Sequence, residues 1–195
     1  MRKAVIDFDD VLFDLDKLIV GNKSIGTKYN IYSTIMRGVD LHRLKTTRFK
    51  FLSNFLNKLF FEKYGSLHNN IEPIDGAVDG IKYIKSLGFE VIVLTTRSEF
   101  LRDITNKWVE KYLQECTDEI IYTNNREPKC DYIKRLEPEI FVDDSIVNFN
   151  GIEYGKIKYP ILYTSKWNKE YDVSKINKKL IRMNKWNEIR FILCN

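Results

Sequence analysis

Two carboxylates follow the first apolar run of the chain, and their types and spacing are suited to chemistry. Ala4, Val5 and Ile6 predict a short buried strand, and Asp7 and Asp9 come after it. Because strand residues alternate in direction, both side chains are expected on one side. Two like charges placed in this way need a cation or a shared proton. The spacing therefore predicts a divalent metal site for phosphoryl chemistry.

Two later apolar runs also end in pairs of polar residues. The pairs are Thr95 and Thr96 after residues 89–94, and Asp143 and Asp144 after residues 140–142. In open parallel sheets, ligands bind at the carboxyl ends of the strands, near a switch point. We therefore expect the three groups to converge on one edge of a sheet and to form a single site.

The negative charge of a phosphate ester suggests a role for each acid. Asp7, Asp9 and Asp143 are predicted ligands of Mg²⁺, which prefers oxygen, and Asp144 is predicted to orient the site. Asp7 is also the predicted nucleophile, which would attack phosphorus and form an aspartyl-phosphate. Asp9 is predicted to protonate the leaving oxygen and then to deprotonate the hydrolytic water.

The phosphoryl oxygens need a hydroxyl group and a cation as charge redistributes. Thr95 is the predicted hydroxyl donor, and Thr96 is a further phosphate contact or its alternative. Lys129 is the predicted ammonium, with Lys134 as its rival. For Arg97 two interpretations stay open, a contact with phosphate or an ion pair with an acid.

The elements that must position these groups alternate regularly after Pro73. Helices are expected at 76–87, 98–114 and 129–136, strands at 89–94, 119–122, 140–142 and 159–163, and a basic helical tail at the end. This alternation predicts a parallel sheet in an α/β fold. Apolar residues at helical spacing within 45–64 favour a helical insert. We therefore predict a core of residues 1–13 and 73–195 and a small helical cap of residues 14–72.

Composition describes a globular protein of ordinary size. Of the 195 residues, 44% are hydrophobic and 30% are charged, and no apolar run approaches membrane-spanning length. The N-terminus has no apolar signal segment, and the three cysteines, Cys116, Cys130 and Cys194, lack the spacing of a metal site. Their odd number argues against a disulfide framework and favours a reducing compartment, so we expect a cytoplasmic protein.

The net charge of +5 is concentrated in two segments. Residues 23–63 carry nine Lys or Arg against two acids, and residues 151–195 carry ten against four. These segments are either solvated basic surface or a positive rim that attracts an anionic substrate, such as a nucleotide or a nucleic-acid end.

The motifs together resemble those of the haloacid dehalogenase (HAD) superfamily of phosphohydrolases. The matching segments are Asp7-Phe8-Asp9-Asp10-Val11-Leu12, Val91 to Thr95, Lys129, and Ile140 to Asp144, in the family's order. The resemblance covers residues 3–24 and 73–165. It implies a Rossmann-like, three-layer α/β fold with a cap inserted after the first strand, and Mg²⁺-dependent hydrolysis of a phosphomonoester.

A closer resemblance is to the 5'(3')-deoxyribonucleotidase-like branch of this superfamily. The similar segments are Glu72-Pro73-Ile74-Asp75-Gly76-Ala77-Val78, Trp108 to Tyr112, and Arg182 to Ile189. This resemblance implies a small phosphorylated substrate, a (deoxy)ribonucleoside monophosphate, over which the cap closes. Two alternatives stay open: a nucleic-acid end (polynucleotide 3'-) phosphatase, and a weakly active regulatory or binding protein with the same site.

Receiver domains of response regulators also combine acids, Thr and Lys around Mg²⁺ on a parallel sheet. Their order is an acidic pair, the phosphorylated Asp, Thr and then Lys. This chain runs Asp7, Thr95, Lys129 and then Asp143, so its order excludes a receiver domain.

Overall fold

The computed structural model describes residues 1–15, 17, 70–97, 99–123, 127–166 and 168–194. The chain divides into two compact units, Met1–Phe13 with Glu72–Asn195, and Asp14–Ile71. Nearly all of the second unit lies outside the described residues, and so does most of the predicted cap at 14–72. The elements described belong to the first unit.

Six parallel strands form one sheet in the order β3-β2-β1-β4-β5-β6. The strands are β1 (Lys3–Ile6), β2 (Glu90–Thr95), β3 (Glu119–Tyr122), β4 (Ile140–Asp143), β5 (Tyr159–Tyr163) and β6 (Ile181–Met183). From β1 the chain builds the sheet outward to β3, then crosses back to β4 and builds it outward to β6. The switch point of the topology therefore lies between β1 and β4, where ligand sites of such sheets are found.

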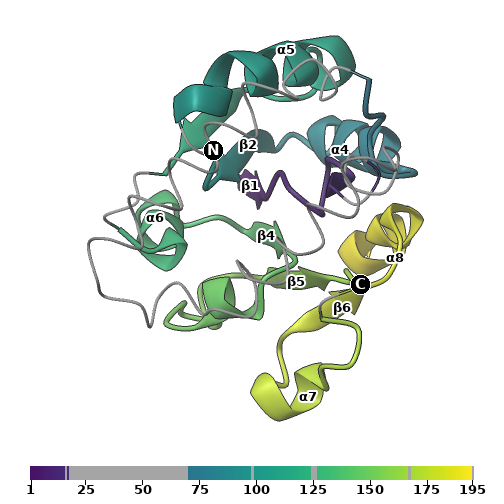
Figure 1. The fold of residues 1–195 in the computed structure, drawn as a ribbon. Coiled ribbons are helices and arrows are strands. Elements are labelled where there is room, and N and C mark those ends of the chain that lie inside the picture. The colour runs from purple at the N-terminus through teal and green to yellow at the C-terminus, as the bar shows by residue number, and fades with distance from the viewer. Residues whose placement is uncertain (16, 18–69, 98, 124–126, 167, 195) are drawn as a thin grey trace. The chain divides into compact units, whose positions relative to one another are not determined.

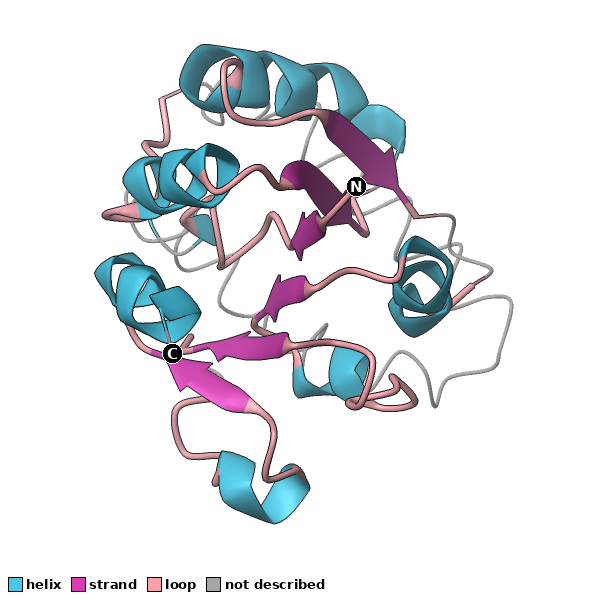
Figure 2. Cartoon of the chain, turned by 180° about the vertical axis from the view of Figure 1, so that it is seen from behind, coloured by secondary structure: helices cyan, strands magenta, loops and turns pink. Residues whose placement is uncertain are grey.

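Helices connect the strands and cover both faces of the sheet (Figures 1 and 2). They are α4 (Ala77–Ser86), η1 (Glu99–Leu101), α5 (Arg102–Leu113), α6 (Lys129–Leu136), η2 (Ile146–Phe149), α7 (Val173–Ile176), η3 (Trp186–Glu188) and α8 (Ile189–Cys194). Helix α4 contacts both α5 and α8, whereas α6 contacts η2, and Figure 1 shows α6 on the opposite side of the sheet from α4 and α8. The predicted Rossmann-like α/β fold with a parallel sheet is confirmed.

The central strand β1 is buried on both faces, as expected for the middle of a parallel sheet. Ala4, Val5 and Ile6 have no exposed surface. Val5 packs in one core cluster with Phe141 of β4 and Ile133 of α6. The residue that follows β1 is therefore held at the carboxyl end of a well-packed central strand.

The C-terminal part differs from the predicted basic helical tail, and that prediction is wrong. The structure has a short helix α7, the strand β6, and then η3 and α8. In β6, Ile181 pairs with Ile161 of β5, and Met183 is fully buried. Three residues are too few to show the alternation of a strand in the sequence. The strand forms because β5 supplies its hydrogen-bond partners.

Trp186 of η3 ties this C-terminal part to the turn after β1. The indole is fully buried, and its Nε1–H donates to the carbonyl of Val11 at 2.8 Å. Its ring also lies against Gly80 of α4, so that a Cβ placed on Gly80 would lie 2.4 Å from a ring carbon of Trp186. The glycine leaves room for the indole, and the indole holds the turn that carries Asp9.

We expect Gly80→Ala to destabilise the protein, although glycine-to-alanine changes inside helices are usually stabilising. The new methyl group must displace the buried Trp186 ring, and such overpacking costs about 1–3 kcal/mol. Gly155→Ala is the matched control, because nothing lies within 4 Å of a Cβ there. Urea unfolding of both variants checks the prediction, and a Gly80→Ala protein as stable as Gly155→Ala contradicts it.

Two findings concern the cysteines and the possibility of a membrane-spanning segment. The three cysteines are free thiols. Among the described residues, no helix combines the length and the apolar character needed to cross a membrane. A cytoplasmic location stays a prediction.

Candidate active site

Asp7 is fixed at the carboxyl end of β1. Its backbone N–H donates to the carbonyl of Val142 at 2.9 Å, so the hydrogen-bond ladder between β1 and β4 extends through this residue. Its Oδ1 accepts from the N–H of Phe8 at 2.7 Å and lies 2.7 Å from Nζ of Lys129. Burial raises the pKa of Asp7 to about 7 against the effect of the Lys129 ammonium, and the charge of Asp143 adds to the rise.

Asp143 ends the neighbouring strand β4 and is fully buried. Its Oδ2 lies 2.8 Å from Nζ of Lys129, and its Oδ1 accepts from the N–H of Ser145 at 2.8 Å. The amide of Asn148 in η2 lies 3.0 Å from each of the two oxygens. Protein donors therefore occupy both oxygens of Asp143.

Lys129, the first residue of α6, bridges the two strand ends through Asp7 and Asp143. Burial by itself would lower its pKa, but the carboxylates of Asp143 and Asp7 outweigh that effect and raise it. Lys134 instead is half-exposed and pairs with Asp131 on the surface of α6. Of the two lysines left open by the sequence, the structure brings Lys129 to the predicted site.

Asp144 completes a cluster of three carboxylates. One oxygen each of Asp7, Asp143 and Asp144 lie within 4.8 Å of one another. Burial raises the pKa of Asp144 well above its ordinary value, and the charges of Asp143, Asp7 and Asp10 add to the rise. Within the described part of the chain, no group donates a hydrogen bond to its carboxylate.

The charges of this cluster do not balance. Among the described residues, the three carboxylates of Asp7, Asp143 and Asp144 face one ammonium, that of Lys129. Buried like charges repel unless a counter-ion compensates them. Clustered carboxylate oxygens are the donors that Mg²⁺ prefers, so the residues present fit a divalent cation of this kind.

The structure places Asp9 outside this cluster, in an ion pair with Arg97. Nη2 of Arg97 lies 2.6 Å from Oδ1 of Asp9, and Nε lies 2.9 Å from Oδ2. The Asp9 side chain is 31% exposed, so part of it stays open to a ligand. Of the two interpretations open for Arg97, this geometry is the ion pair with an acid.

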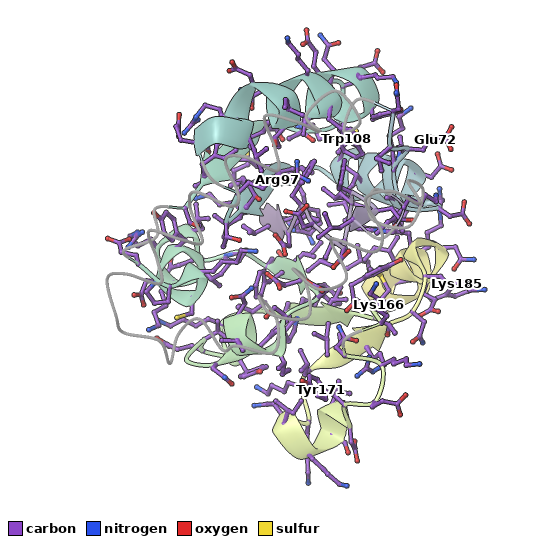
Figure 3. All side chains as sticks on the ribbon, in the orientation of Figure 1. Glu72, Arg97, Trp108, Lys166, Tyr171 and Lys185 are labelled. Atoms are coloured by element: carbon purple, nitrogen blue, oxygen red, sulfur yellow. The ribbon has the colours of Figure 1, made fainter. Side chains whose placement is uncertain are left out.

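The long side chain of Arg97 is held in place by contacts on several sides. Its guanidinium centre lies 4.3 Å from the ring centroid of Phe8 and 4.5 Å from that of Phe13. Nη1 donates to Oγ1 of Thr105 on α5 at 3.0 Å, and Figure 3 shows Arg97 between the sheet and α5. A guanidinium held against two aromatic rings and by a hydrogen bond fixes the carboxylate of Asp9 in turn.

The two threonines after β2 differ in exposure. Thr95 is buried, and its Oγ1 accepts from the backbone N–H of Arg97 at 3.2 Å. Thr96 is exposed. Since β2 pairs with β1, both lie at the same sheet edge as Asp7, and their phosphate-binding roles stay predictions.

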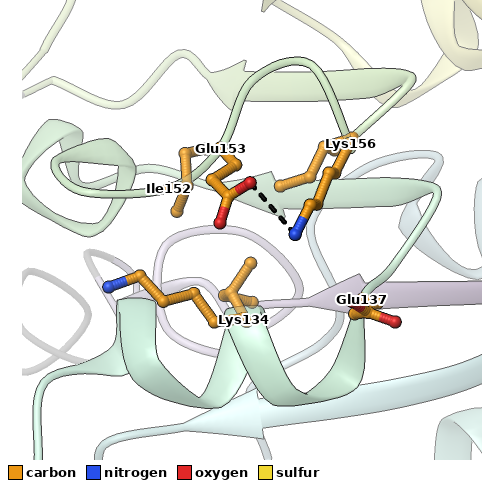
Figure 4. Close-up of a pocket in the computed structure, with 7 residues that line it drawn as sticks. Lys134, Glu137, Ile152, Glu153 and Lys156 are labelled. Carbon is orange, nitrogen blue, oxygen red and sulfur yellow. Dashed lines mark ion pairs between the residues drawn. The ribbon is translucent and has the colours of Figure 1, made fainter.

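A small pocket lies elsewhere, between α6 and the segment before β5. Its volume is about 30 Å³, room for roughly one water molecule, and it is lined by Lys134 of α6 and by Glu137, the residue that follows this helix. Glu153 and Lys156 line the other side and form an ion pair at 3.0 Å (Figure 4). None of the three clustered carboxylates lines this pocket.

The sequence interpretation missed two groups that hold the site. Asn148 binds both oxygens of Asp143, and the Trp186 indole, expected only to pack, also holds the Val11 carbonyl. An amide five residues after Asp143 was a weak local signal. The Trp186 contact joins residues 175 positions apart and had no local signal.

The comparison with solved structures gives many matches of low sequence identity. A candidate HAD-hydrolase from Bacillus subtilis bound to magnesium has a TM-score of 0.63 and 18% identity, covering 100% of this chain and 99% of that chain. A HAD-superfamily hydrolase from Ehrlichia chaffeensis has a TM-score of 0.54 and 18% identity, covering 100% and 98%. A candidate phosphoglycolate phosphatase from Lactobacillus delbrueckii has a TM-score of 0.59 and 12% identity, covering 98% of each chain.

No family model and no curated protein matches the sequence. The structural matches extend over nearly the full length of both chains. Together with the parallel sheet and its switch point, they identify the architecture. The chain has the fold of the HAD-superfamily hydrolases.

Proposed function

We propose that this chain is a Mg²⁺-dependent phosphomonoesterase that works through an aspartyl-phosphate on Asp7. The observation that carries the proposal is the cluster of Asp7, Asp143 and Asp144 around the buried ammonium of Lys129 at the sheet switch point. A magnesium-bound protein and a candidate phosphatase among the structural matches support it.

The carboxylate of Asp7 attacks phosphorus, and the ester P–O bond breaks. The leaving oxygen takes a proton from Asp9, and water then attacks the phosphorus of the aspartyl-phosphate while Asp9 takes up its proton. The products are the alcohol and inorganic phosphate. Lys129 and the hydroxyl of Thr95 or Thr96 stabilise the phosphoryl oxygens. Bound Mg²⁺ would supply positive charge that reduces the repulsion between the attacking carboxylate and the phosphate.

The hydrogen bonds favour Asp7 and Asp144 as the principal metal ligands. Asp143 already accepts from Lys129, Ser145 and Asn148, whereas no described group donates to the Asp144 carboxylate. This assignment exchanges the roles that the sequence suggested for Asp143 and Asp144. The direct metal contact predicted for Asp9 fits less well, because its carboxylate is paired with Arg97.

For the substrate we propose a (deoxy)ribonucleoside monophosphate, on the motifs of residues 72–78, 108–112 and 182–189. The cap that closes over this substrate would be formed by residues 14–72, most of which lie outside the described residues. The alternative is a nucleic-acid end, for which the second basic segment supplies exposed lysines such as Lys178 and Lys179.

The test is phosphate release with Mg²⁺ from nucleoside monophosphates, sugar phosphates and 3'-phosphorylated oligonucleotides. Turnover of nucleoside monophosphates supports the full proposal. Preference for the oligonucleotide, with a steep loss in salt, selects the nucleic-acid end. No release from any monoester, with Mg²⁺ still bound, refutes the enzymatic proposal and favours a binding protein.

Removal of one metal-binding carboxylate should weaken Mg²⁺ binding. We expect Asp144→Asn to remove the Mg²⁺-dependent rise in unfolding temperature of the wild-type protein, because a ligand stabilises only the state that binds it. Asp131→Asn, which changes a half-exposed carboxylate of α6 that pairs with Lys134, should keep that rise. Equal Mg²⁺ responses of the two variants contradict the assignment of Asp144.

A further inference from the structure

Asn168, in the connection from β5 to β6, is buried, and its side-chain amide makes four hydrogen bonds, three of them to residues outside this connection. Its Nδ2 donates to the carbonyls of Asp144 and Tyr163, both at 2.7 Å. Its Oδ1 accepts from the N–H of Ser165 at 3.2 Å and from Nη1 of Arg182 at 3.1 Å. A buried amide with all its partners satisfied fixes the segments that it joins.

Arg182 of β6 fixes Asn168 from the other side. Its Nη1 donates to Oγ1 of Thr164 at 3.0 Å. Its Nη2 donates to the carbonyls of Asn168 at 3.1 Å and Tyr171 at 2.6 Å. The planar guanidinium therefore links the β5–β6 connection to β6 through hydrogen bonds. Asn168 in turn links this connection to the turn after β4.

The point that Asn168 reaches is the backbone of Asp144. The carboxylate of Asp144 accepts no hydrogen bond from the described residues, in contrast to that of Asp143 with its four contacts. The position of the Asp144 carboxylate in the cluster therefore depends on where its backbone is held. Asn168 holds that backbone from 24 residues further along the chain.

We propose that Asn168 and Arg182 are positioning residues that place the Asp144 carboxylate and thereby set the affinity of the site for Mg²⁺. The inference rests on the metal site of the proposed function and adds two residues that touch neither metal nor substrate. Partners that orient metal ligands from outside typically change affinity by about 10- to 100-fold.

The test is Mg²⁺ binding to the full chain, measured by isothermal titration calorimetry. We expect Asn168→Ala to raise the Mg²⁺ dissociation constant about tenfold. Asn184→Ala is the matched control, because Asn184 accepts a bond from Thr164 at 2.8 Å in the same network and leaves the bonds of Asn168 in place. Its dissociation constant should equal that of the wild type.

A merely structural role predicts a different result. Asn168→Ala would then lower the unfolding temperature in EDTA, while the folded variant would bind Mg²⁺ as tightly as the wild type. That result overturns the proposal. Arg182→Lys keeps the charge and the whole of Asn168 but loses the planar fork, and it should weaken Mg²⁺ binding in the same direction. If Asn168→Ala does not fold, wild-type affinity in Arg182→Lys overturns the proposal.

The outcomes also separate this inference from the proposed function. Wild-type protein that binds Mg²⁺ but releases no phosphate refutes the phosphatase, while a loss of affinity in Asn168→Ala still supports the positioning role. Wild-type protein that binds no Mg²⁺ overturns both.

Discussion

Asp7→Asn should abolish turnover, with a fall in kcat on the order of 10⁴-fold or more, as for the loss of a nucleophile elsewhere. The amide is neutral and a poor nucleophile, so no acyl-phosphate can form. The fold should survive, because the amide matches the carboxylate in size and removes one of three clustered negative charges. The measurements are phosphate release and acid-quench trapping of a phosphorylated protein.

The matched control for this prediction is Asp131→Asn, which changes a half-exposed acid beside Lys134. Its turnover should equal that of the wild type. Thermal unfolding of both variants separates a chemical loss from a folding loss. An Asp7→Asn protein that keeps substantial turnover, or still becomes phosphorylated, would sink the assignment of Asp7.

Arg97→Met should lower both stability and activity. It leaves the Asp9 carboxylate without its cation, and removing one partner of a fully buried pair costs about 3–5 kcal/mol. Because the Asp9 side chain is 31% exposed, we expect a smaller loss, about 2–3 kcal/mol. Since Asp9 then loses its fixed position, kcat should also fall about 10²-fold, the lower range for a lost acid–base group.

The control for Arg97→Met is Arg102→Met, five residues further on. Arg102 pairs with an exposed Glu99 on the surface, where solvent screens the charges, so its loss should change stability much less than the loss of Arg97. A double-mutant cycle of Arg97→Met with Asp9→Asn should give a coupling of about 1–3 kcal/mol, because the two side chains are in direct contact. Additive effects would show that the Asp9–Arg97 pair carries no stability.

The sequence by itself determined the sheet and the edge where the acids lie. Apolar runs of three to six residues that end in polar groups are a local signal for β1, β2 and β4. The elements β3, β5 and α6 also begin and end at the residues that the sequence predicts. Asp7, Thr95 and Asp143 each end or follow one of these runs, so a parallel sheet, which collects the carboxyl ends of its strands on one edge, brings them together there.

Only the tertiary structure decided how these groups are paired. Lys129 rather than Lys134 reaches the acids because α6 turns its first residue toward the ends of β1 and β4. The partner of Arg97 was open because Asp9 lies 88 positions away. The strand β6 and the contacts of Asn168 and Trp186 also depend on distant backbone carbonyls and sheet edges. Periodicity reports which face of an element is buried, whereas hydrogen bonds between distant segments exist only once the chain has packed.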